Sequence, residues 1–287
     1  MLYKMSNYKD INKILKYGKA RGKYLLHMLL PNLSDINELY VLESYEDYLK
    51  IASELPEKVI LRADAELGKA PTLGVRGCAI EKDKIPDYIK LVKKNNKDGT
   101  VLCIDTKVEN EKSSISGSFN IHFEWGHCII IEYLSEGFDI GGITKGEDIH
   151  EIYYIPWNQI LFTKHMNEYK VYNISDEQYK ESAIRKINSL VKKGLEEEAK
   201  TIPLTYKPIN GAIHKMIFDE IIIPILYDKN KIYGLETSSF GIQGMIRKNK
   251  EKYILQPVEF RTSERHVEKD FYNKYLVPKE KQYKITL

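Results

Sequence analysis

The strongest limit on the fold comes from the central third of the chain, where strand-like runs alternate with turn signals. β-Branched and apolar residues fill residues 59–65, 101–106, 119–125 and 128–134. The spacing of apolar residues predicts a helix over residues 84–94, between the first two of these runs. Strands that alternate with helices predict an α/β or α+β fold, and we expect two lobes with a cleft between them.

Helical patterns dominate the segments on either side of this central third. Helices are predicted over residues 7–29, 45–54, 175–193 and 213–223. Ser175 and Gln178 form a capping-box pattern, which makes the start of the third helix the clearest of these boundaries. Nearer the C-terminus, residues 241–247 and 253–262 predict two strands joined by a turn over KNKEK.

Charge and composition argue against several classes of protein. The 44 basic and 41 acidic side chains nearly cancel, to a net charge of +3, which gives no general attraction to nucleic acid or to an anionic membrane. The three cysteines are scattered, so neither a disulfide framework nor a cysteine-rich zinc site is predicted. Apolar runs fall short of the ~20 residues of a membrane span and no signal-peptide pattern is present, so we expect a cytoplasmic protein without a membrane partner.

A glycine-bearing loop with basic residues follows the first central strand. Arg62 lies on this strand, Lys69 in the loop ELGKAPTLGVRG, and Arg76 where the chain returns to a strand. Loop N–H groups and positive side chains are what a triphosphate requires, so these residues are candidates for binding phosphates. The alternative is a β-hairpin with solvated basic residues, since the loop lacks the GxxxxGK[ST] pattern of a P-loop.

A second candidate segment, residues 128–142, is an apolar strand followed by acidic residues. The strand ends at Glu132, Tyr133 and Leu134, where apolar side chains would flank an adenine ring and backbone groups would read its edge. Asp139 follows and would accept hydrogen bonds from ribose hydroxyls. The alternative is a buried core strand with a polar turn after it.

These two segments, in this order, resemble the ATP-grasp superfamily. The cation-bearing strand, glycine loop, helix and hinge strand of that family are matched by VILRAD, ELGKAPTLGVRG, DKIPDYIKLVKK and IIIEYL. The strand YILQPVEFRT is similar to a late strand of the ATP-binding domain of pyruvate-phosphate and phosphoenolpyruvate dikinases. The resemblance implies an N-terminal helical region over 1–56, a nucleotide-binding lobe with glycine loop and hinge over 57–157, and a C-terminal lobe with the metal-binding strand over 158–287.

The resemblance also implies an ATP-dependent ligase or phosphotransferase that acts on a small-molecule substrate, with ATP and Mg²⁺ as cofactors. Glu259 and Gln256 on the closing strand would hold Mg²⁺, while Arg62 and Arg261 would stabilise the transferred phosphoryl group. The chain departs from the family at Arg62, where lysine is usual, and at Gln243, where an acidic residue is expected before the closing strand. Mg²⁺ prefers anionic oxygen ligands, so the amide at Gln243 weakens the expected metal site.

Three other functions stay open at this point. His122, Glu124 and His127 in HFEWGH would suit a metal hydrolase, although no second ligand cluster completes the set. The basic N-terminal helix would suit a nucleic-acid-binding protein, which the balanced charge disfavours. A nucleotide-like fold without turnover would suit a non-catalytic interaction protein. The sequence identifies neither the substrate nor the oligomeric state.

Overall fold

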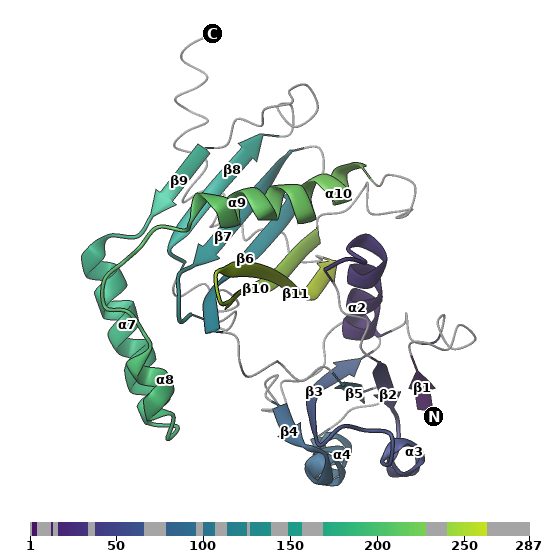
Figure 1. The fold of residues 1–287 in the computed structure, drawn as a ribbon. Helices are drawn as coiled ribbons and strands as arrows, with labels where there is room; N and C mark the ends of the chain where they lie inside the picture. The colour runs from purple at the N-terminus through teal and green to yellow at the C-terminus, as the bar shows by residue number, and fades with distance from the viewer. Residues whose placement is uncertain are drawn as a thin grey trace. The chain divides into compact units, whose positions relative to one another are not determined.

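The structure of the protein is a computed structural model of the full chain. The structure describes residues 2–4, 13, 17–33, 38–65, 79–95, 100–106, 114–124, 127–138, 149–156, 169–227 and 240–262. The backbone contacts divide the chain into two units, Met1–Glu111 and Lys112–Leu287. Each unit contains one antiparallel sheet with helices packed on it (Figure 1), so each is described separately.

Unit 1 is built on a five-stranded sheet in the order β1-β2-β5-β3-β4. Its strands are β1 (Leu2–Lys4), β2 (Leu39–Leu42), β3 (Lys58–Ala65), β4 (Ala79–Glu81) and β5 (Thr100–Asp105). Its helices are α2 (Gly18–Leu29), α3 (Tyr45–Ile51), the short 3₁₀ helix η1 (Lys82–Lys84) and α4 (Ile85–Asn95). The sheet is antiparallel throughout these strands.

Side-chain alternation along the strands gives the unit 1 sheet two covered faces. Val59 and Leu61 on β3 belong to a buried cluster with Ile89 of α4 and with residues of α3. Val41 and Cys103 point to the other face, where Ala20 of α2 packs against them. Successive residues of a strand face opposite sides, so Arg62 and Asp64 lie on the α2 side of the sheet.

Unit 2 contains a six-stranded antiparallel sheet in the order β11-β10-β6-β7-β8-β9. Its strands are β6 (Ser114–Glu124), β7 (Cys128–Leu134), β8 (Glu151–Pro156), β9 (Tyr169–Asn173), β10 (Phe240–Asn249) and β11 (Lys252–Thr262). Its helices are α7 (Asp176–Val191), α8 (Glu196–Lys200), α9 (Gly211–Ile217), the π-helical turn η2 (Phe218–Ile222) and α10 (Ile223–Tyr227). Figure 1 shows α9 and α10 lying across one face of this sheet.

The face of the unit 2 sheet beneath α9 is apolar. Phe119, Ile131 and Ile242 are fully buried. Across the neighbouring strands β6, β10 and β11, Phe240 stacks on Phe123 and on Phe260. A hydrogen bond of 2.7 Å joins the Tyr133 hydroxyl to Nδ1 of His214 on α9. The side chains that alternate with these residues therefore point to the opposite face of the sheet.

The structure confirms the mixed α+β class and several local predictions. Ser175 and Gln178 form the capping box at the start of α7, and the KNKEK turn joins β10 to β11 with Lys250 in the left-handed region at a φ of 55°. Of the helix predicted over residues 7–29, Gly18–Leu29 forms α2 and Lys13 is also helical, whereas residues 7–12 and 14–16 lie outside the described part of the chain. No described helix has the length and apolar character to cross a membrane.

The boundary between the units lies inside the segment that the sequence assigned to one nucleotide-binding lobe, residues 57–157. β3, β4 and β5 belong to unit 1, whereas β6 and β7 pair with β10 and β8 in unit 2. Local periodicity identifies a strand but not its partners, so the division of the central strands between two sheets could not be predicted from periodicity.

Candidate functional site

Four polar residues line up across neighbouring strands on the face of the unit 2 sheet opposite α9, and three of them, Asn120, Glu132 and Gln243, are buried. Glu132 on β7 pairs with Asn120 on β6, Asn120 with Gln243 on β10, and Gln243 with Glu259 on β11. Directly paired residues of antiparallel strands place their side chains on the same face, about 5 Å apart. We call these four residues the polar row.

One end of the polar row is a compact hydrogen-bonded cluster. The Asn120 amide donates to Glu132 Oε2 at 2.6 Å, and His122 Nε2 lies 3.1 Å from the same oxygen. Asn120 Nδ2 and His122 Nε2 are 2.6 Å apart, since both converge on that carboxylate. The Glu132 side chain is 7% exposed and the His122 side chain 30%, so a buried carboxyl group contacts a more accessible imidazole.

Gln243, at the centre of the row, carries an unusual buried oxygen. The residue is 2% exposed, and Oε1 has no hydrogen-bond partner in the described part of the chain. An unpaired buried acceptor costs about 1–3 kcal/mol. A donor or cation supplied by a ligand would remove that cost, so this atom identifies a candidate binding position.

Gln256, which the sequence assigned to a metal, is engaged by a cation of the protein. Its Oε1 accepts a hydrogen bond of 2.6 Å from Nε of the buried Arg247. The guanidinium charge next to this oxygen opposes the approach of Mg²⁺. The metal role of Gln256 therefore stays a prediction that this hydrogen bond disfavours, whereas Gln243 Oε1 on the same hairpin has no hydrogen-bond partner among the described residues.

The predicted hinge, Glu132 to Leu134, is an interior strand segment with its backbone already paired. Residues of this segment pair with β6 on one side and, through Glu132 and Tyr133, with β8 on the other. The Tyr133 carbonyl also accepts from the His150 N–H, at 2.9 Å. Glu132 and Tyr133 therefore have no backbone edge for adenine, and the Tyr133 side chain points to the α9 face.

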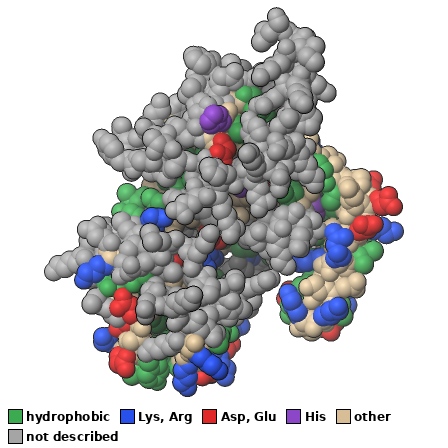
Figure 2. All heavy atoms as spheres, turned by 180° about the vertical axis from the view of Figure 1, so that it is seen from behind, with side chains coloured by type: hydrophobic (Ala, Val, Ile, Leu, Met, Phe, Trp, Pro, Cys, Tyr) green, Lys and Arg blue, Asp and Glu red, His purple; other side chains and the backbone are tan. Residues whose placement is uncertain are grey.

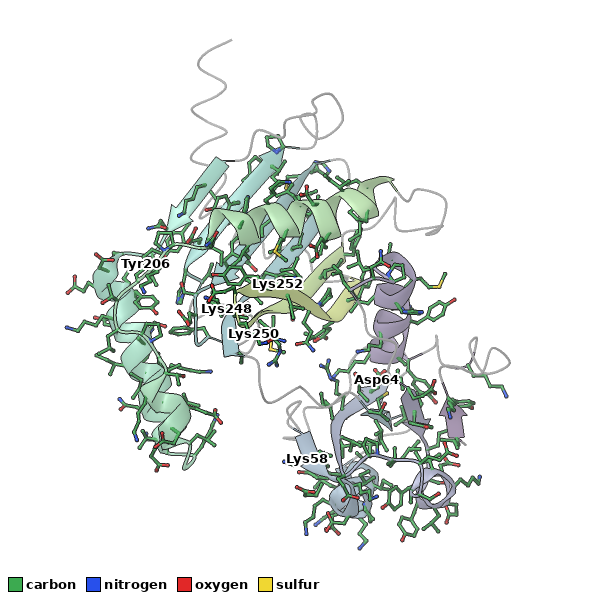
Figure 3. The ribbon with its side chains drawn as sticks, viewed as in Figure 1. Lys58, Asp64, Tyr206, Lys248, Lys250 and Lys252 are labelled. Atoms are coloured by element: carbon green, nitrogen blue, oxygen red, sulfur yellow. The ribbon has the colours of Figure 1, made fainter. Side chains whose placement is uncertain are left out.

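The predicted phosphate ligands are divided between the units. Arg62 lies half-buried on β3 of unit 1. Strand alternation places it on the same face as Asp64, which is labelled in Figure 3. Arg261 lies on β11 as the register partner of Gly241. Lys69, Arg76 and Asp139 lie outside the described residues.

Asp64 has a structural role that the sequence reading missed. Its Oδ2 accepts hydrogen bonds from the backbone N–H groups of Lys19 and Ala20, at 2.8 and 3.0 Å. The carboxylate on β3 therefore caps the first turn of α2, where a negative charge also complements the helix dipole. An ion pair of 3.0 Å between Lys23 and Asp105 adds a second link between α2 and the sheet.

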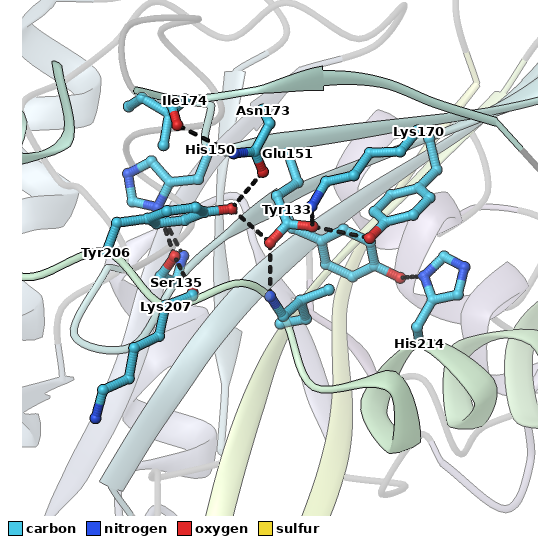
Figure 4. A network of polar contacts seen from close by, with 12 residues as sticks. Tyr133, Ser135, His150, Glu151, Lys170, Asn173, Ile174, Tyr206, Lys207 and His214 are labelled. Atoms are coloured by element: carbon cyan, nitrogen blue, oxygen red, sulfur yellow. Dashed lines mark hydrogen bonds and ion pairs between the residues drawn. The ribbon is translucent and has the colours of Figure 1, made fainter. Parts of the chain in front are cut away.

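A second polar network surrounds Glu151 at the start of β8 (Figure 4). Its Oε1 accepts from the Tyr206 hydroxyl and the Ile209 N–H, both at 2.6 Å. Its Oε2 accepts from Lys170 at 2.7 Å and from the Tyr153 hydroxyl at 2.8 Å. Burial opposes ionisation of Glu151, but these four donors outweigh it and lower its pKa. With both oxygens fully used, the network fixes the segment that leads into α9.

Metal-ligating side chains are sparse among the described residues. They contain no group of three or more His, Cys, Asp or Glu residues arranged to hold a metal ion. Glu132 and Glu259 are three strand spacings apart, or about 14 Å, so they cannot share one ion. Any cation on this face would therefore be held by one carboxylate or imidazole together with amide oxygens.

The surface charges of the described residues are mixed in sign. Figure 2 shows basic and acidic side chains interspersed on the face that it displays. Lys248, Lys250 and Lys252 gather at the β10–β11 turn (Figure 3), where Lys248 lies 5.7 Å from the Tyr253 ring centroid.

Neither comparison with known proteins assigns the chain to a family. No family model matches it, and no curated protein resembles it at a significant level.

Proposed function

We propose that the chain is an ATP-dependent enzyme of ATP-grasp type, a ligase or phosphotransferase that acts on a small molecule. The polar row carries this proposal, because it places carboxylate and amide oxygens on one sheet face that includes the closing β10–β11 hairpin. Oxygen ligands of this kind suit Mg²⁺, and the buried unpaired oxygen of Gln243 fits a cation.

In this proposal Glu259 and Gln243 hold Mg²⁺ against the phosphates. Bound Mg²⁺ would neutralise phosphate charge during phosphoryl transfer. Arg62, Lys69 and Arg76 would bind phosphate oxygens as charge-assisted hydrogen-bond donors, and Arg261 would stabilise the transferred group or a substrate carboxylate. These residues would accelerate the reaction by positioning ATP and the substrate and by neutralising the charge of the phosphates.

Calorimetry of ATP binding with and without Mg²⁺ tests this function. We expect Mg²⁺-dependent heat for the wild type, and loss of its Mg²⁺-dependent part in Glu259→Gln. Arg62→Ala should weaken binding in both conditions, because it removes a phosphate contact and no metal ligand. Glu251→Gln is the matched control, since Glu251 is exposed at the turn of the same hairpin. A wild type that gives no heat with ATP and Mg²⁺ would refute the proposal.

A second candidate is a non-catalytic interaction protein that keeps the nucleotide fold. The absence of a three-residue acidic or histidine metal group in the described part of the chain favours it. ADP release measured with a panel of carboxylates and amines separates the two, because only the enzyme turns ATP over.

A further inference from the structure

His150, the residue before β8, is completely buried among aromatic rings. Its relative exposure is 0%. The imidazole lies edge to face with the rings of Phe138, Tyr179 and Tyr206, at centroid separations of 4.6, 5.0 and 6.2 Å. Because the ring is out of contact with water, a positive charge on it would be costly.

The contacts of the imidazole determine its protonation state. The backbone N–H of Ser135 donates to Nδ1 of His150 at 2.9 Å (Figure 4), and the Ser135 hydroxyl oxygen lies 2.9 Å from the same nitrogen. A backbone N–H can donate but cannot accept, so Nδ1 must carry a lone pair. The folded protein therefore holds His150 neutral, with the ring proton on Nε2.

This hydrogen bond fixes the turn that follows β7, from Ser135 to Phe138. The Ser135 carbonyl accepts from the Phe138 N–H at 3.1 Å, which closes the turn. Phe138 in turn packs in the buried cluster that holds Tyr179 and Ala183 of α7. A second proton on His150 would set Nδ1–H against the Ser135 N–H at 2.9 Å, and two donors cannot share that distance.

The charged groups around His150 do not compensate for a second proton. The ionisable side chains on the described elements that surround it are Glu136, Glu151, Tyr172, Tyr179, Tyr206 and Lys207. Glu136 and Lys207 are exposed, and each oxygen of Glu151 already accepts two hydrogen bonds. The Tyr179 hydroxyl donates to a backbone carbonyl and the Tyr206 hydroxyl to Glu151. Protonation of His150 therefore requires the turn to open and the ring to meet water.

We propose that His150 is a pH-sensitive switch that controls the turn from Ser135 to Phe138. The turn is closed while the imidazole is neutral, and it opens when Nδ1 takes up a proton. A water-exposed histidine has a pKa of about 6.5, so each pH unit below that value favours the open, protonated state by up to about tenfold. The switch requires no nucleotide, and it acts above pH 4.5, where the contribution of Glu151 is still complete.

Nuclear magnetic resonance of the ¹⁵N-labelled full chain tests the switch without any substitution. At about pH 7.5 the His150 resonances should show an unprotonated Nδ1 and a protonated Nε2. Between about pH 7.5 and about pH 5, the hydrogen-exchange protection factor of the Ser135 amide should fall at least about tenfold, whereas those of the interior strand β10 should change less than about twofold. A proton on Nδ1 at the higher pH, or an unchanged protection factor for Ser135, would overturn the switch.

His150→Phe provides the second test, because it keeps a ring and removes the titrating nitrogens. We expect the Ser135 amide of this variant to be weakly protected to the same extent at both pH values. His127→Phe is the matched control, since His127 is exposed at the turn between β6 and β7, and it should keep the wild-type response. An acid response that persists in His150→Phe would also overturn the switch. If that variant does not fold, the wild-type resonances and protection factors decide. A lack of ATP binding would refute the proposed function and leave the switch standing.

Discussion

At the scale of single residues, Glu151 shows how a buried charge is accommodated in unit 2. The residue is 1% exposed, and each carboxylate oxygen accepts two hydrogen bonds. Its donors come from β8, β9 and the segment before α9, so one side chain ties together parts of the chain that are far apart in sequence. Such a group stabilises the fold only while all of its partners remain in place.

Glu151→Gln should therefore destabilise the protein strongly. The amide group would direct N–H donors at groups that are themselves donors, and leave the Lys170 charge without its partner. We expect a loss of about 3–5 kcal/mol in the free energy of unfolding, measured by urea denaturation. Glu251→Gln, which removes an exposed carboxylate, should change it by less than about 0.5 kcal/mol. Equal effects in the two variants would contradict the structural role of Glu151.

The lowered pKa of Glu151 also predicts a pH dependence. Its folded-state pKa lies below the ordinary value of 4.5, so its stabilising contribution is complete above pH 4.5 and is lost as pH falls through the folded-state pKa. In urea denaturation between about pH 6 and about pH 3, the free energy of unfolding of the wild type should fall more steeply than that of Glu151→Gln. Parallel curves would show that other carboxylates control acid unfolding.

At the scale of secondary structure, tertiary contacts complete elements that the local sequence leaves unfinished. α2 begins after Tyr17, which makes no side-chain cap hydrogen bond, and has no acidic residue in its first turn. Asp64 supplies both the acceptor and the negative charge from β3. The start of α2 is therefore fixed by a residue 44 positions away from Ala20.

Asp64→Ala should loosen the start of α2. Loss of a capping side chain costs about 0.5–2 kcal/mol, and Asp64→Asn should cost less because an amide oxygen can still accept. Hydrogen exchange at the Lys19 and Ala20 amides should accelerate in Asp64→Ala, whereas amides of β7 in unit 2 should be unaffected. Unchanged protection of Lys19 and Ala20 would exclude Asp64 as the cap.

The two glycines of β10 should respond differently to the same substitution. A Cβ at Gly244 would lie only 2.6 Å from Cε1 of the buried Phe119 ring and 2.8 Å from the Gln256 carbonyl oxygen, whereas Gly241 has room for one. Gly244→Ala should therefore lose about 1–3 kcal/mol by overpacking, and Gly241→Ala should not. Thermal unfolding of both variants measures this, and equal melting temperatures would contradict the strand packing.

At the scale of the whole molecule, the balance of charge limits the partners. The net charge of +3 and the mixed signs seen in Figure 2 provide no extended basic surface on that face of the described residues. A protein that binds nucleic acid through phosphates shows affinity that falls steeply with salt. We expect no measurable RNA or duplex DNA binding near physiological salt in a mobility-shift assay. Salt-sensitive binding that Lys13→Ala weakens would instead favour the nucleic-acid alternative.

Part of the candidate site was predictable from sequence. Glu259, Glu132 and Arg261 were selected, and the first two lie in the polar row. Gln243 was noted only as a missing carboxylate, and Asn120 was not considered. The signal for these residues is weak, because an amide in a strand becomes informative only when its neighbours across the sheet are known. The hydrogen bond from Arg247 to the Gln256 side-chain oxygen could not be predicted from sequence, because it depends on the pairing of β10 with β11.

The sequence by itself determined the local elements: the alternating strands, the capped start of α7 and the β10–β11 turn, because periodicity and capping act over a few residues. Only the tertiary structure decided which strands share a sheet and in what register. Pairing of β6 with β10 joins residues more than 100 positions apart, and a shift of one residue would turn Asn120 and Gln243 to the apolar face. Burial of that apolar face beneath α9 favours the observed register, and the register in turn assembles the polar row.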